Sequence, residues 1–154
     1  MSAALLTSAF LSFAGVLVTA WSGVTGASLS RHILFGIFST LLTLLTHSML
    51  MFYLIGKGRA VREAAAEGGL STDFARRIAE LRRPVFSLAT LAMSLTIVAA
   101  LIGASVHTRM LPASVHGILA AMAIAANMAM LRAEVSALMA SAQVVAEVNR
   151  LLNA

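Results

Sequence analysis

Residues 31–58 read RHILFGIFSTLLTLLTHSMLMFYLIGKG, and this stretch decides what kind of protein the chain forms. Between His32 and Lys57, the only side chain that could carry a charge near neutral pH is the imidazole of His47. A helix of this length, rising about 1.5 Å per residue, crosses the roughly 30 Å hydrocarbon core of a bilayer. The stretch therefore predicts a transmembrane helix over about residues 33–55.

The composition of the whole chain indicates the same class. Of the 154 residues, 60% are hydrophobic and 11% are charged, whereas about 25% of the residues in a soluble domain are charged. We therefore expect an integral membrane protein in contact with the lipid bilayer. The net charge of +5 is explained by basic residues that flank membrane spans, so we expect no nucleic-acid partner. The absence of cysteine excludes disulfides, thiol catalysis and cysteine-ligated metals.

The apolar stretches predict an all-α fold, an integral membrane four-helix antiparallel bundle. Short polar connections follow the first and third stretches, as antiparallel neighbours require. The first stretch has no basic residues before it, so we expect a retained span rather than a signal peptide. No stretch repeats another convincingly. We expect one membrane domain over residues 1–154, with spans at about residues 3–24, 33–55, 85–106 and 113–131.

The segment 57–83 is the main hydrophilic part of the chain and holds 7 of its 11 basic residues. Gly68 and Gly69 divide it. Beyond them, apolar residues recur at the spacing of one helix face, which predicts an amphipathic helix before the third span, lying on the membrane surface or on a partner. The residues of that face are Phe74, Ile78, Leu81 and Val85.

The distribution of basic residues predicts the orientation. Nine of them belong to the segment 57–83 and the C-terminal tail, whereas only Arg31 and Arg109 lie between spans on the other side. Because basic residues favour the cytoplasmic side, we expect both termini in the cytoplasm. We place the protein in a bacterial inner membrane.

The tail, residues 132–154, contains no helix breaker and is expected to continue the fourth helix into the cytoplasm. Apolar residues spaced by four and three form a heptad seam with Asn149 at one core position, as in coiled coils that set their register. We leave open whether this seam pairs chains or packs on the segment 57–83 of its own chain. The expected oligomerisation seam consists of Leu131, Val135, Leu138, Ala142, Val145, Asn149 and Leu152.

His47 is the ionisable residue placed deepest in any predicted span. It is the 15th residue of the second span counted from Ile33, and Asn127 is the 15th residue of the fourth counted from Ala113. In an antiparallel bundle the two residues reach the same depth, which predicts an interhelical hydrogen bond between them. The alternative, one axial ligand of a haem, lacks a second histidine at that depth.

Three further histidines are predicted to gather at the outer ends of the spans. His32 opens the second span, His107 closes the third, and His116 lies in the first turn of the fourth. Three imidazoles that converge are sufficient to bind zinc or copper. We therefore treat them as a candidate site for a metal ion or haem, with three ordinary interfacial histidines as the alternative.

Small and hydroxyl side chains recur on one face of the first and second spans. Such faces let membrane helices approach closely, and we prefer this interpretation to a pore lining. The residues of this possible pore or packing face are Ser8, Ser12, Thr19, Thr40 and Thr43.

The motifs indicate a non-catalytic protein. No Asp or Glu lies inside a predicted span, and no nucleophile, zinc-protease or phosphate-loop motif occurs. We expect an accessory or scaffold subunit of a larger membrane complex, of respiratory or photosynthetic type, that contacts other subunits or copies of itself. One alternative is a homo-oligomeric channel or transporter held by a C-terminal coiled coil. The other is a haem- or metal-binding redox subunit that uses His47 or the outer histidines.

Overall fold

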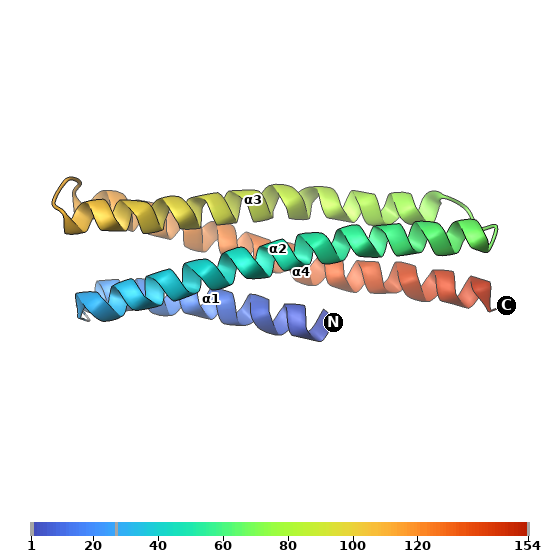
Figure 1. Ribbon diagram of the computed structural model, residues 1–154, viewed down its shortest axis with the longest axis horizontal. Helices are drawn as coiled ribbons and strands as arrows, with labels where there is room; N and C mark the ends of the chain where they lie inside the picture. Colours follow the sequence, from blue (N-terminus) through green and yellow to red (C-terminus); the bar gives the residue numbers. More distant parts are fainter. Residues whose placement is uncertain (1, 27, 154) are drawn as a thin grey trace.

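The computed structural model describes residues 2–26 and 28–153 and consists of four long helices. Consecutive helices run in opposite directions and lie side by side (Figure 1), with α1 on α2 and α4, and α3 on α4 and α2. All four are long and apolar enough to cross a membrane, as expected of an all-helical integral membrane protein. The helices are α1 (Ser2–Val24), α2 (Leu29–Glu67), α3 (Asp73–His107) and α4 (Ala113–Leu152).

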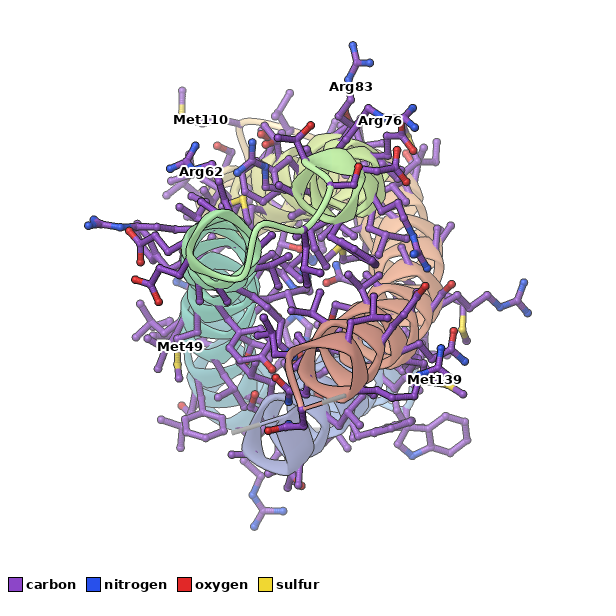
Figure 2. All side chains as sticks on the ribbon, turned by 90° about the vertical axis from the view of Figure 1, so that its right-hand side faces the viewer. Met49, Arg62, Arg76, Arg83, Met110 and Met139 are labelled. Atoms are coloured by element: carbon purple, nitrogen blue, oxygen red, sulfur yellow. The ribbon has the colours of Figure 1, made fainter. Side chains whose placement is uncertain are left out.

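Three of the helices are much longer than a bilayer is thick. The 40 residues of α4 measure about 60 Å, about twice the hydrocarbon thickness. At one end, α2, α3 and α4 therefore continue beyond the first residues of α1 as a three-helix extension (Figure 1). Arg62, Arg76 and Arg83 project outward there (Figure 2). We call the opposite end, where α1 joins α2 and α3 joins α4, the hairpin end.

The hydrophilic segment 57–83 forms no separate helix, which differs from expectation. Instead α2 continues to Glu67, and α3 begins at Asp73 and passes through Pro84 without interruption. Gly68 and Gly69 form the turn between them, and Gly69 adopts φ +65°, a left-handed conformation that glycine reaches without steric cost. The predicted amphipathic stretch is thus the first part of α3.

The apolar face of this stretch is covered by the chain itself. Phe74 and Ile78 are buried in a cluster with Val61 of α2 and with Val144 and Val148 of α4. Burying such side chains contributes roughly 1.5–3 kcal/mol each, so this cluster holds the three-helix extension together.

The buried face of the α4 tail lies one residue earlier than the predicted oligomerisation seam. Of that seam, Leu138 is buried and Leu131, Val135 and Val145 are half-buried, whereas Ala142, Asn149 and Leu152 are exposed. One residue turns a helix by about 100°, so the predicted seam lies beside the buried face, and its pairing between chains stays a prediction. The buried face consists of Met130, Glu134, Ala137, Ser141, Val144 and Val148.

The two hairpins, α1–α2 and α3–α4, bury equivalent positions although their sequences do not repeat convincingly. Leu5, Ala9, Ser12 and Val16 of α1 are buried, and so are the residues 80 positions later, Val85, Ala89, Ala92 and Thr96. In α2 and α4 the same holds at an offset of 84, from Ser39, Thr43, Thr46, Leu50 and Leu54 to Ala123, Asn127, Met130, Glu134 and Leu138. The molecule is therefore built from two like hairpins packed together, and membrane proteins with internal repeats commonly place their sites where the repeats meet.

Candidate functional site

At the hairpin end, the structure brings His32 and His116 together. Each is the fourth residue of its helix, α2 for His32 and α4 for His116. Their ring centres are 5.9 Å apart and the ring planes are inclined by 86°. Two of the three histidines expected at this end are therefore neighbours, one from each hairpin.

Each of these rings is held by a backbone carbonyl of the preceding helix. The Nδ1 of His32 lies 3.1 Å from the carbonyl oxygen of Thr19, and the Nδ1 of His116 lies 3.0 Å from that of Ala99. The Nδ1 of His32 also lies 3.1 Å from the hydroxyl of Ser22, which itself donates to the carbonyl oxygen of Thr19 at 2.7 Å. Because a carbonyl oxygen can only accept, these contacts favour the tautomer that carries the hydrogen on Nδ1, which leaves Nε2 of the neutral imidazole with a free electron pair. Metal-ligating histidines are commonly oriented in this way.

A glycine lies against each ring, four residues after the carbonyl that binds it. A Cβ at Gly23 would stand 2.9 Å from Cε1 of His32, and a Cβ at Gly103 would stand 3.1 Å from Cε1 of His116. Any larger residue would displace the imidazole. In each hairpin, one histidine is thus positioned by a backbone carbonyl and by the glycine four residues after it.

The third expected ligand, His107, does not join the pair. It is the last residue of α3 and its side chain is exposed. Within residues 2–26 and 28–153, no three His, Cys, Asp or Glu side chains come close enough to hold one metal ion. The arrangement that the structure forms is therefore a site of two imidazoles rather than three.

The spacing of the two rings suits a shared metal. An imidazole nitrogen binds zinc at about 2.0–2.1 Å and the ring centre lies about 1.2 Å further away, so two imidazoles on one ion have centres about 5–6.5 Å apart. The observed 5.9 Å falls in this range. Neutral imidazoles suit copper, zinc and haem iron, whereas calcium and magnesium require oxygen ligands.

In the middle of the spans, His47 and Asn127 form a hydrogen bond. Nε2 of His47 donates to Oδ1 of Asn127 at 3.1 Å. The amide nitrogen of Asn127 donates to the carbonyl oxygen of Ala123 at 2.8 Å, which fixes the orientation of the amide, and to the hydroxyl of Thr96 at 3.0 Å. This network joins α2, α4 and α3. Nε2 of His47, the nitrogen that would bind a haem iron, is already bonded to Asn127 in it.

The hydroxyl face of α1 and α2 lies where these helices pack. The hydroxyls of Ser8 and Ser12 donate to carbonyls of their own helix at 2.8 and 3.0 Å. Thr19 does the same at 2.8 Å and lies 3.0 Å from the hydroxyl of Ser39. Thr40 is half-buried, whereas Thr43 is buried and its hydroxyl has no hydrogen-bond partner within the described residues. Hydroxyls bonded as those of Ser8, Ser12 and Thr19 are typical of closely packed membrane helices.

Glu134 is a buried carboxyl group that the sequence pattern did not reveal. It is completely buried, and neither carboxyl oxygen has a hydrogen-bond partner within the described residues. It is the 22nd residue counted from Ala113, which places it level with Leu54, the 22nd residue of the second predicted span counted from Ile33. The signal that could have located it is the heptad spacing of three polar residues on one face of α4, namely Asn127, Glu134 and Ser141.

A scan against protein-family models, a search of curated proteins and a search of solved structures each find no match to this chain. The function is therefore argued from the geometry of the chain's own residues.

Proposed function

We propose that the chain is a membrane-integral subunit that holds a transition-metal centre, either an ion or a haem iron, between His32 and His116. The observation that carries this proposal is the pair of imidazoles with ring centres 5.9 Å apart, each bound through Nδ1 to a backbone carbonyl. In this state both Nε2 atoms are available as ligands. Copper or haem iron would supply one-electron chemistry there, whereas zinc would serve a structural role.

The exposed surface of the apolar helices supports contact with lipid and with other membrane proteins. Large apolar side chains remain exposed on every helix, including Phe10 and Trp21 of α1 and Phe38 of α2. Such a surface suits lipid and the apolar faces of other subunits or of further copies of the chain. In the proposed topology both termini and the three-helix extension lie in the cytoplasm of a bacterium, where the extension would serve as a docking module, and the histidine pair lies at the outer face.

The experiment is a metal analysis of the full-length protein purified in mild detergent. Elemental analysis and an optical spectrum separate the two possible sources, because bound haem gives a Soret band and a bare ion does not. We expect about one metal per wild-type chain, and a loss of at least tenfold for His32→Ala and for His116→Ala. His107→Ala is the matched control, since that exposed histidine stands outside the pair.

Two results would overturn the proposal. One is wild-type protein with neither stoichiometric metal nor a Soret band after expression in medium supplied with copper, zinc and haem precursor. The other is equal metal loss in all three variants, which would indicate unspecific binding to surface imidazoles. Circular dichroism of each variant distinguishes the loss of a ligand from the loss of the fold.

A further inference from the structure

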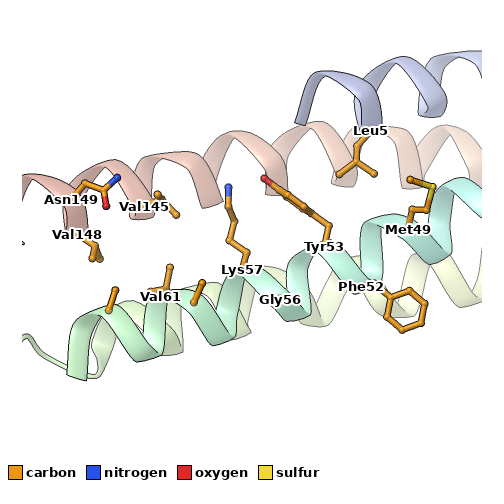
Figure 3. A pocket seen from close by; sticks show the side chains of 12 residues that line it. Leu5, Met49, Phe52, Tyr53, Gly56, Lys57, Val61, Val145, Val148 and Asn149 are labelled. Atoms are coloured by element: carbon orange, nitrogen blue, oxygen red, sulfur yellow. The ribbon is translucent and has the colours of Figure 1, made fainter. Parts of the chain in front are cut away.

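A groove of about 690 Å³ opens far from the histidine pair, where α1 begins and α2 and α4 continue without it (Figure 3). Its walls come from one face of α2 and one face of the α4 tail, and Leu5 of α1 closes its end. Most of the lining is apolar, and it continues on both sides of Lys57. Leu5, Met49 and Phe52 lie on the side of the spans, and Val61, Val145 and Val148 lie on the side of the three-helix extension.

One cation lies in this apolar groove. Lys57 and Tyr53 project from α2 toward α4 (Figure 3), and Nζ of Lys57 lies 5.0 Å from the centre of the Tyr53 ring. Within the part of the chain that the structure describes, the ion pairs involve only arginines, so the positive charge of Lys57 is not neutralised by a carboxylate. Asn149 of α4 adds an amide to the same groove.

We propose that the groove binds one anionic phospholipid, with the phosphate at Lys57 and an acyl chain along the apolar wall on its span side, which Leu5, Met49 and Phe52 form. Tyrosine and lysine together mark the headgroup level of a membrane, and these two lie where the second span ends. A partly desolvated ammonium attracts an anionic headgroup, and the walls provide the apolar surface that an acyl chain requires. The charge of Lys57 therefore selects an anionic lipid over a neutral one.

This site is independent of the proposed metal site. Lys57 follows His32 by 25 residues on the same helix, which separates them by about 37 Å. A protein without metal can bind the lipid, and a protein without the lipid can bind metal. The outcomes of the two experiments are therefore separate.

The test reconstitutes the full-length protein in vesicles of phosphatidylcholine mixed with phosphatidylglycerol and counts retained lipids by native mass spectrometry. We expect wild type to retain one phosphatidylglycerol. Lys57→Gln should lower its retention about fivefold, because one basic residue near a headgroup is worth about that factor. Arg62→Gln, which removes one exposed charge from the same helix outside the groove, should leave retention unchanged.

A second variant tests the groove while keeping the charge. Gly56 lines the groove and is exposed, and a Cβ there meets no atom within 4 Å. Gly56→Phe should therefore fill space on the span side of Lys57 without disturbing the fold, and should also reduce retention. Equal retention in wild type, Lys57→Gln and Gly56→Phe would overturn the proposal. So would equal retention of the neutral and the anionic lipid, equal losses in Lys57→Gln and Arg62→Gln, or a dimer abolished by Gly56→Phe, which would assign the groove to a second copy.

Discussion

His47 and Asn127 are 80 residues apart in the sequence, and Nε2 of the first lies 3.1 Å from Oδ1 of the second. The bond joins α2 to α4 at the depth where counting residues along the two spans places both side chains. Because Asn127 also donates to Thr96 of α3, a single amide connects three of the four helices.

Asn127→Ala should therefore cost about 1–2 kcal/mol of unfolding free energy, since it leaves the donor of His47 buried without a partner. The measurement is unfolding in mixed detergent micelles, followed by circular dichroism. A double-mutant cycle with His47→Phe should give a coupling of about 0.6 kcal/mol, and at most about 1.7. Met128→Ala, an exposed neighbour, serves as the control. Strictly additive losses would show that the bond contributes nothing.

Gly103→Ala should reduce metal binding without altering a ligand. The new Cβ would stand 3.1 Å from Cε1 of His116, so the ring must shift by a few tenths of an ångström. Gly117→Ala is the matched control, because a Cβ there meets no atom within 4 Å. Both changes raise helix propensity by roughly 1 kcal/mol, so they should affect the helices alike. We expect metal per chain to fall at least tenfold in Gly103→Ala alone. Such a loss would come from the contact with His116 and not from a change in helix stability. Equal metal content in the two variants would count against the glycine contact as a determinant of the site.

Apolar packing rather than an ion pair should hold the three-helix extension. Arg77 of α3 and Glu147 of α4 pair at 2.8 Å but remain partly exposed, so Arg77→Ala should cost no more than about 1 kcal/mol. Ile78 is buried beside them, and Ile78→Ala should cost about 2–4 kcal/mol. Hydrogen exchange across residues 140–152 checks the contrast, and faster exchange in Arg77→Ala than in Ile78→Ala would reverse this ranking.

The sequence allowed the helical class, the four apolar helices and the alignment of His47 with Asn127 to be predicted, because helix length and residue counting depend only on the rise of a helix. It did not reveal the register of the α4 tail. An apolar pattern places Val135 in a core and Glu134 on a surface, whereas the structure buries Glu134 completely and leaves Val135 half-buried. Likewise, Gly68, Gly69 and Pro84 suggested an interrupted segment, but α2 and α3 are long helices because their apolar faces pack on α4.

The contact between His32 and His116 was only half predicted, for a related reason. Depth along the spans placed three histidines at one level, but which of them face each other depends on the rotation of each helix. That rotation is set by contacts such as Gly23 with His32 and Gly103 with His116. These contacts do not appear in the periodic pattern of apolar residues from which helix faces are predicted. The equivalence of the two hairpins was hidden because matched buried positions carry different kinds of side chain, as Thr43 and Asn127 do.

Because the molecule consists of two hairpins, the two histidines of the pair come from different halves of the chain. His32 belongs to one half of the polypeptide and His116 to the other, so neither half carries both imidazoles of the proposed metal site. Only the docking of α1–α2 against α3–α4 brings the two rings together. Metal bound at this site would then report that the two hairpins have docked, as the signal of a split protein reports that its two fragments have recombined.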